Sequence, residues 1–123
     1  MKKFNYRKSN YVVVENVSLE EAMEVVTINQ RGAVVVVNSK GTLLGILSDG
    51  DTRRALLRGA TLMTPVSKLI NLNAISLSSK ANVSKLSEEI FRTNTVVNII
   101  PVVDGKNNVV NIVVRNPNVR KEL

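Results

Sequence analysis

Residues 45–51 read Gly-Ile-Leu-Ser-Asp-Gly-Asp and run from an apolar segment into a polar corner. The apolar segment, Thr42 to Leu47, predicts a β-strand. The corner opens a predicted helix from Thr52 to about Arg58, which stops at Gly59. Ser and Asp are typical N-cap residues, because their side-chain oxygens accept the free backbone N–H groups of a first helical turn. Residues 45–51 therefore predict a strand-to-helix corner.

The residues before this corner predict one more strand, a helix and the first half of a hairpin. Tyr11–Val14 is a short apolar strand, and Ser18 is the expected N-cap of a helix that ends at Arg31-Gly32. Ala33–Val37 is entirely apolar, as in a strand buried on both faces. The polar turn 38–41 then joins it to the strand before the corner.

The second half of the chain repeats this order of elements. Pro65 predicts a short helix from Val66 to Ile70, and further elements are expected at Ala74–Leu77 (strand), Val83–Arg92 (helix), Ile99–Val103 (strand) and Val109–Val114 (strand). Position i of the first hairpin matches position i + 66 of the second without a gap, and the helices align better at i + 64.

The repeat predicts an α/β fold of two βαββα units. Each unit is too small to bury a core alone, so the pair should fold as one body. We expect two three-stranded sheets, each flanked by two helices, to pack through their faces about an approximate two-fold axis. The expected organisation is a basic segment (1–9), a first repeat (10–62), a second repeat (63–116) and a tail (117–123).

The composition removes several kinds of chemistry. The chain has 123 residues with no Cys, His or Trp, which excludes a disulfide framework, thiolate or His-based catalysis and Cys/His metal sites. The net charge of +7 favours an anionic partner. Nucleic acid is not expected, because the basic residues are dispersed and four aromatic residues offer few platforms for base stacking. No apolar run suits a signal peptide or a membrane helix, so the expected location is the cytoplasm without membrane contact.

The corner and the repeat together resemble a CBS-domain pair, or Bateman module, over about residues 10 to 115. Ser48 and Asp51 match the family pattern of a hydrophobic strand, Ser or Thr, two residues and Asp. The longer stretch Ser48–Gly59 resembles the CBS pair that precedes a sugar-phosphate nucleotidyltransferase domain, and a similar stretch occurs in arabinose-5-phosphate isomerases. The resemblance implies that any catalytic domain lies outside this chain, so no catalytic residue and no enzymatic activity are expected.

The resemblance also implies a regulatory site for an adenosine nucleotide or a nucleotide-sugar, with no required cofactor and no dedicated metal. Asp51 would accept hydrogen bonds from the ribose hydroxyls, and Ser48 would lie near the ribose or phosphate. The other implied nucleotide-binding residues are Asp49, Arg53 and Arg54 at the start of the helix, with Val12 and Ala33 beside the base. The module would form a homodimer through its helices and control a linked or partner sugar-nucleotide enzyme.

The second repeat departs from the family pattern. Val114 stands where Ser48 stands in the first repeat, and Pro117 stands where Asp51 stands. The carboxylate expected to bind ribose is therefore missing, and we expect one nucleotide site per chain.

The corner residues also fit a purely structural role. Ser48 and Asp51 are common helix caps, and Arg53 and Arg54 could pair with Asp49 or Asp51 instead of a phosphate. The rival function is a structural module that only holds a catalytic partner as a dimer. A nucleic-acid binder driven by net charge would instead show affinity that collapses with salt.

Overall fold

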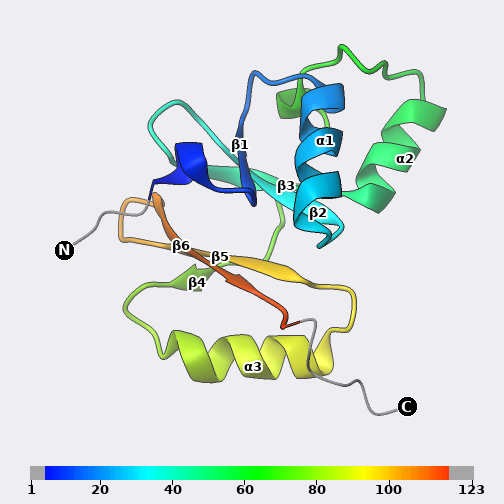
Figure 1. Ribbon diagram of the computed structural model, residues 1–123. Coiled ribbons are helices and arrows are strands. Elements are labelled where there is room, and N and C mark those ends of the chain that lie inside the picture. Colours follow the sequence, from blue (N-terminus) through cyan, green and yellow to red (C-terminus); the bar gives the residue numbers. More distant parts are fainter. Residues whose placement is uncertain (1–4, 117–123) are drawn as a thin grey trace.

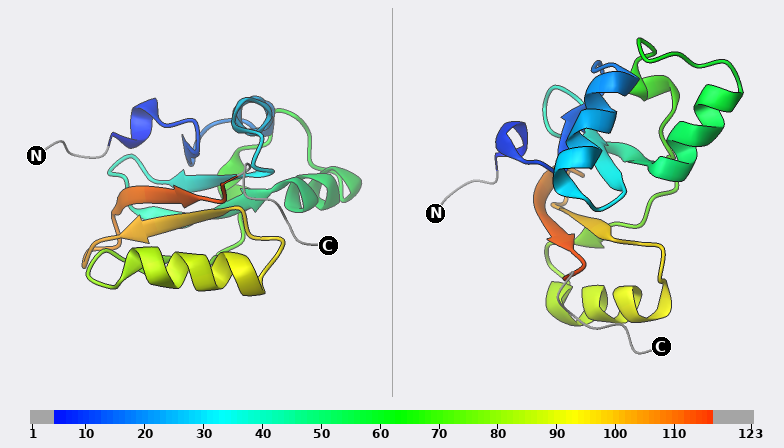
Figure 2. Two further views of the ribbon diagram at one scale, coloured as in Figure 1. Left: turned by 60° about the horizontal axis from the view of Figure 1, so that its bottom comes forward. Right: turned by 45° about the vertical axis from the view of Figure 1, so that its right-hand side comes forward.

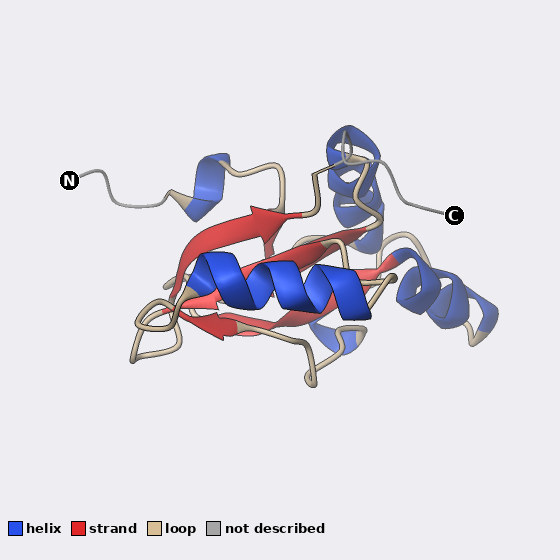
Figure 3. Ribbon diagram, turned by 90° about the horizontal axis from the view of Figure 1, so that it is seen from below, coloured by secondary structure: helices blue, strands red, loops and turns tan. Residues whose placement is uncertain are grey.

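The computed structural model describes residues 5–116 of the 123-residue chain. Two three-stranded sheets lie face to face, with α1 and α2 outside one sheet and α3 outside the other (Figure 1). Seen from below, α3 lies along the outer face of its sheet (Figure 3). The two further views show the same stacking of helix and sheet layers (Figure 2).

The first sheet and its helices come from the first repeat. The elements are β1 (Val12–Val14), α1 (Leu19–Asn29), β2 (Ala33–Val37), β3 (Leu43–Ser48) and α2 (Asp49–Leu57), preceded by the 3-10 helix η1 (Tyr6–Lys8). β2 lies in the middle of the sheet, parallel to β1 and antiparallel to β3. Its central position explains why its last four residues are buried.

The second sheet repeats this topology. After the 3-10 helix η2 (Val66–Lys68), the elements are β4 (Leu77–Ser78), α3 (Val83–Thr93), β5 (Ile99–Val103) and β6 (Val109–Val114). β5 lies in the middle, parallel to β4 and antiparallel to β6.

The hairpins agree in detail, which confirms the predicted repeat and fold class. The hairpin register shifts between Val36 and Val37 in the first sheet and between Val102 and Val103 in the second, which are equivalent positions in the predicted alignment of the hairpins. The helices α1 and α3 begin after the N-caps Ser18 and Asn82, which are likewise equivalent in the predicted alignment of the helices.

The core has two parts. One lies between the first sheet and its helices and includes the fully buried side chains of Leu19, Val34 and Leu47. The other lies between the two sheets and joins Val35 and Val37 of the first repeat to residues of the second, namely Ile99, Val103 and Val109. Because this second part needs both repeats, neither repeat completes its core alone.

The two repeats also meet through backbone hydrogen bonds at the hairpin ends. Leu43 N donates to Asn107 O at 2.9 Å, and Val109 N donates to Gly41 O at 2.9 Å. Each bond is the image of the other when the equivalent hairpin positions are exchanged. The approximate two-fold axis therefore passes between the hairpins, as predicted.

Some predicted boundaries were wrong at helix ends. α2 begins at Asp49 and not at Thr52, because Ser48 is its N-cap. α1 ends at a left-handed C-cap formed by Gln30 (φ 57°), just before the expected stop at Arg31-Gly32. The short helix expected at Val66–Ile70 begins at Val66 after the N-cap Pro65, but it is a 3-10 helix that ends at Lys68.

The linker between the sheets explains the remaining differences. The strand expected at Ala74–Leu77 is β4 at Leu77–Ser78, where the chain first reaches β5. Earlier in the linker, Asn71 pairs with Ile46 of the first sheet instead. Within residues 5–116 the second repeat has no counterpart of α2, so one helix flanks its sheet where two were expected. Pro117 and the tail 117–123 lie outside the described residues, as do residues 1–4 of the basic segment.

Candidate functional site

The predicted corner is built as a capping box. Ser48 Oγ accepts from Asp51 N at 3.1 Å, and Asp51 Oδ2 accepts from Ser48 N at 3.1 Å. The Ser48 hydroxyl also donates to the same Asp51 oxygen at 2.9 Å. The side chains thus satisfy the free N–H groups at the start of α2, and the capping role predicted as one alternative is confirmed.

Hydrogen bonding decides the charge of Asp51. Partial burial alone would raise the pKa of its carboxyl. The Ser48 N–H, the Ser48 hydroxyl and the Arg54 guanidinium together outweigh burial and hold this pKa below the ordinary value of 3.8. Asp51 is therefore an anion at neutral pH, with hydrogen bonds on both oxygens.

The two arginines of α2 differ in their partners. Arg54 forms an ion pair with Asp51, with 2.8 Å between Nη2 and Oδ1. The exposed side chain of Arg53 makes no hydrogen bond or ion pair within residues 5–116. The pairing predicted as an alternative to phosphate binding thus holds for Arg54.

Val12 and Ala33 lie in the apolar layer between the sheets. Val12 is buried in β1, and Ala33 begins β2, where it pairs with Ser48 of β3. Both belong to the apolar cluster that the two sheets share. The structure therefore brings Ala33 next to the corner and leaves Val12 on the neighbouring strand.

A cleft of about 480 Å³ opens beside this corner. Among the residues predicted for the site, only Asp49 lines it. The other lining residues come from the end of α1, from the turn into β2 and from the second repeat: Val26, Thr27, Gln30, Arg31, Gly32 and Asn98. The cleft thus lies where the two repeats meet, because Asn98 belongs to the second repeat and the other lining residues belong to the first. Gly32 and Asn98 hold equivalent positions in the two repeats.

The turn between α1 and β2 is held by the buried side chain of Asn29. Its Oδ1 accepts from Arg31 N at 2.7 Å, and its Nδ2 donates to Asn10 O at 2.9 Å and to Ala33 O at 3.1 Å. Asn98 Nδ2 adds a bond of 3.2 Å to Arg31 O from the second repeat. From sequence, Arg31 was interpreted only as the end of a helix, and Asn98 was not singled out. A basic residue next to a glycine, directly before a buried strand, was the signal present in the sequence.

The equivalent corner of the second repeat is filled by an arginine. Arg115 occupies the position of Asp49, and its N–H donates to Asn98 O at 2.8 Å just as Asp49 N donates to Gly32 O at 2.9 Å. The Arg115 guanidinium turns back and donates to the carbonyl oxygens of Phe91 (2.7 Å) and Asn94 (2.9 Å) near the end of α3. The Arg115 side chain therefore joins the second corner to the end of α3 by hydrogen bonds.

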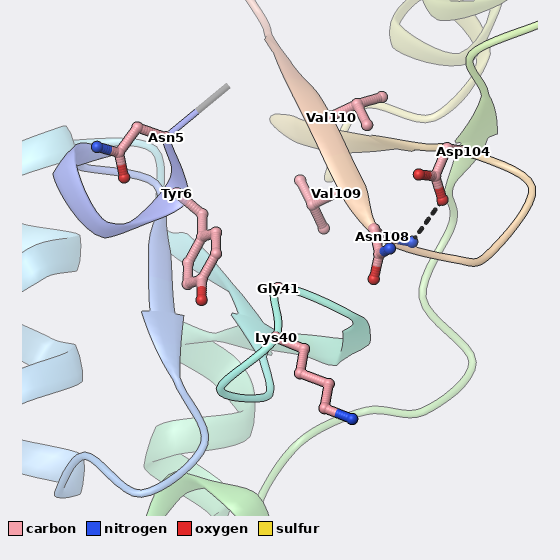
Figure 4. A pocket seen from close by; sticks show the side chains of 8 residues that line it. All are labelled: Asn5, Tyr6, Lys40, Gly41, Asp104, Asn108, Val109 and Val110. Atoms are coloured by element: carbon pink, nitrogen blue, oxygen red, sulfur yellow. Dashed lines mark hydrogen bonds between the residues drawn. The ribbon is translucent and has the colours of Figure 1, made fainter. Parts of the chain in front are cut away.

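A second cavity, of about 470 Å³, lies at the opposite ends of the strands (Figure 4). It is enclosed by η1 and the two hairpins, with Tyr6, Lys40 and Val109 among its walls. Tyr6 packs against the hairpin of the first repeat, and its hydroxyl donates to Ser39 O at 2.7 Å. None of the residues predicted for the site lines this cavity.

The described part of the chain lacks two features that would suggest other functions. Within residues 5–116, no three or more Asp or Glu side chains gather as they would around a metal ion. None of the helices described is both long and apolar enough to cross a membrane.

Comparison with known proteins identifies the family of the first repeat. Residues 5–58 match the CBS domain family. No curated protein gives a significant match to the sequence.

Solved structures share the fold at low sequence identity. The CBS domain protein PAE2072 from Pyrobaculum aerophilum, complexed with AMP, is 19% identical with a TM-score of 0.65, over 84% of this chain and 78% of that one. The CBS domain pair of MJ0100, in complex with 5-methylthioadenosine and S-adenosyl-L-methionine, is 23% identical with a TM-score of 0.65, over 87% and 82%. CbpB in complex with c-di-AMP is 17% identical with a TM-score of 0.69, over 85% and 70%. Residues 5–58 thus match the CBS domain family, and the chain shares the fold of solved CBS-domain pairs.

Proposed function

We propose that this chain is a regulatory module that senses an adenine nucleotide, or a nucleotide-sugar, in the cleft beside the first-repeat corner. The observation that carries the proposal is the cleft itself, which polar side chains of both repeats line next to the start of α2. Its volume of about 480 Å³ is within the usual range for small-molecule sites. PAE2072, MJ0100 and CbpB, which share the fold, are known in complex with adenine-containing ligands.

The corner residues supply the chemistry that such a ligand needs. Asp49, which lines the cleft, offers carboxylate oxygens to ribose hydroxyls, and the capping box of Ser48 and Asp51 holds the start of α2 beside it. Arg53 and Arg54, which the sequence suggested for a phosphate, lie on the first turns of α2 and do not line the cleft. Val12 and Ala33, expected beside the base, do not line the cleft, whereas the apolar side chain of Val26 does.

The regulatory step follows from where the cleft lies. A ligand that contacts Arg31 and Asn98 contacts both repeats at once. Such a ligand binds one relative arrangement of the repeats better than another and shifts their equilibrium toward it. No covalent chemistry is needed for this role.

The test is calorimetric titration of the chain with AMP, ADP, ATP and several nucleotide-sugars, with CMP and GMP to test base preference. We expect saturable binding of at least one ligand at one site per chain. A ligand at 100 times its dissociation constant should also stabilise the fold by about 2.7 kcal/mol. Heats no larger than those of buffer with every ligand, at millimolar concentration and with a folded chain, would contradict the proposal.

The regulated enzyme is proposed from the resemblance of residues 48–59 alone. That stretch points to a sugar-phosphate nucleotidyltransferase. The measurement is nucleotidyltransferase activity with and without this chain and its nucleotide. An activity that ignores both would contradict this part of the proposal.

A second candidate is a structural dimerisation module, favoured by the apolar residues on and after α2. Leu57 is 81% exposed and Met63 is 74% exposed, with Leu56 and Leu62 also open to solvent. These side chains are suited to burial against a second copy of the chain. Light scattering should give a dimer for the native chain and a monomer for Leu57→Glu, with the exposed Arg53→Glu as control. A monomeric native chain would contradict this candidate.

A further inference from the structure

We propose that Arg31 binds the oxyanion of the ligand in the cleft, and that Asn98 of the second repeat positions Arg31 for this task. The inference rests on the proposed function and names the part of the ligand that the cleft selects, a phosphate or another oxyanion. It assigns this role to a residue of the α1–β2 turn and not to the arginines of α2.

The first observation is that the Arg31 guanidinium has no hydrogen-bond or ion-pair partner among residues 5–116. Its side chain makes no hydrogen bond or ion pair within residues 5–116, and its Nε is buried without an acceptor. A buried donor without an acceptor is costly, so a ligand oxygen that accepts from it restores a favourable interaction. Because no described residue hydrogen-bonds this side chain, turning it toward a ligand breaks no hydrogen bond with that part of the chain. The flat guanidinium fork also matches the paired oxygens of a phosphate.

The second observation is that the two arginines at the start of α2, Arg53 and Arg54, lie outside the cleft. Arg54 is held by Asp51 at 2.8 Å, so a ligand would have to break that ion pair. Neither Arg53 nor Arg54 lines the cleft. Among the cleft-lining residues that the structure describes, Arg31 carries the single positive charge.

Asp49 fixes the direction of the ligand in the same cleft. It lines the wall with Arg31, and the two side chains form no ion pair in the described part of the chain. A carboxylate repels an oxyanion and accepts hydrogen bonds from hydroxyl groups. The oxyanion should therefore lie at Arg31 and the hydroxyl-bearing part of the ligand toward Asp49.

Asn98 holds the Arg31 backbone from the second repeat. Its Nδ2 donates to Arg31 O at 3.2 Å, and its Oδ1 accepts from Arg115 Nε at 3.0 Å. Both the nitrogen and the oxygen of the Asn98 side-chain amide are therefore hydrogen-bonded. A ligand held by Arg31 is thus connected through Asn98 to Arg115 and the end of α3.

The test compares AMP with adenosine, which lacks only the phosphate. Calorimetry on the native chain and on Arg31→Gln, with Arg53→Gln as the matched loss of one positive charge, gives the ratio of the two affinities. Loss of a charge-assisted hydrogen bond predicts a roughly 10- to 100-fold weaker affinity of Arg31→Gln for AMP, with adenosine unchanged. Arg53→Gln should leave both affinities as they are. Asn98→Ala should lower the AMP-to-adenosine ratio by a smaller factor, about 3- to 10-fold.

Three results would overturn the inference. These are unchanged affinities for both ligands in Arg31→Gln, an equal loss of affinity for both ligands in Arg31→Gln, and a larger loss of AMP affinity in Arg53→Gln than in Arg31→Gln. Arg31→Lys is the second variant if Arg31→Gln does not fold, and it should retain part of the preference for AMP because it keeps the charge but not the fork.

A direct measurement separates this inference from the adenine proposal. Inorganic pyrophosphate should shift the NMR signal of the Arg31 Nε–H and not that of Arg53. If pyrophosphate shifts the Arg31 Nε–H signal while AMP and adenosine fail to bind, the anion site is supported and the proposal of an adenine ligand is wrong. If AMP binds and neither AMP nor pyrophosphate shifts that signal, the nucleotide site stands and the role of Arg31 is wrong.

Discussion

Thr42 Oγ1 donates a hydrogen bond of 2.8 Å to Asn108 Oδ1, and the two residues are 66 apart in sequence. They occupy the same place in the two hairpins, so this bond joins equivalent positions across the approximate two-fold axis. The backbone bonds of Leu43 to Asn107 and of Val109 to Gly41 flank it on both sides. The junction between the repeats is therefore a short hydrogen-bonded ladder at one end and the cleft at the other.

Thr42→Val should destabilise the chain by about 1 kcal/mol, because Asn108 Oδ1 loses its donor in a partly buried setting while the shape of residue 42 is nearly kept. Urea unfolding measures this as a lower midpoint with an unchanged slope. Thr42→Ser keeps the hydroxyl and should stay nearer to the native stability. Equal destabilisation by both variants would show that the methyl group matters and not the hydrogen bond.

Much of this junction could be predicted from sequence. Continuous apolar runs with polar turns predicted all four long strands, and the alignment of the two hairpins predicted which positions are equivalent in the two repeats. β4 was placed too early because strand pairing needs a neighbour, and residues 74–76 have none in the sheet. That neighbour is set by how the linker crosses between the sheets, which local patterns do not encode.

The candidate site was harder to predict. Ser48 and Asp51 were found because they match a local family pattern of fixed spacing, and because Ser and Asp are common helix caps. The cleft depends on Arg31 and Asn98, which are far apart in sequence and meet only when the sheets stack. Their chemistry could not be inferred from spacing, since no local motif links them.

Gly45→Ala should be strongly destabilising, by about 2 kcal/mol, because an added methyl group has no room beside the linker. A Cβ at residue 45 would lie 2.5 Å from Asn71 O, where the linker pairs with β3. Backbone must therefore move to relieve the overlap. The equivalent position in the second hairpin, Asn111, is exposed in β6, so Asn111→Ala is the matched control. Thermal unfolding that gives the two variants the same midpoint would refute the close approach.

The stability of the chain should fall on acidification through Asp51. The pKa of its carboxyl is lowered in the folded state, so at a pH between the folded and unfolded pKa values the unfolded chain binds more protons than the folded chain. The free energy of unfolding therefore rises with pH in this range. The contribution is complete above the ordinary pKa of 3.8 and is lost as pH falls through the lower, folded value.

The measurement is urea unfolding of the native chain and of Asp51→Asn between pH 5 and pH 2.5. The native chain should lose more stability than Asp51→Asn over this window. Ser48→Ala removes the hydrogen bond from the Ser48 hydroxyl to this carboxylate, along with the cap bond from Asp51 N, and should behave between the two. Parallel pH profiles for the native chain and Asp51→Asn would contradict the role of this carboxylate.

Arg115→Ala should destabilise the second repeat by about 3 kcal/mol, since it removes the donor for several carbonyl groups at once. The guanidinium bonds to Phe91 O, Asn94 O and Val97 O and lies 4.9 Å from the Phe91 ring centre. These acceptors are uncharged, so the loss should be nearly the same in about 0.1 M and about 1 M salt. Arg92→Ala, an exposed arginine of α3, is the control and should change stability by less than about 0.5 kcal/mol. A loss that disappears in high salt would instead indicate that Arg115 acts through its charge alone, and the second corner would not be locked as described.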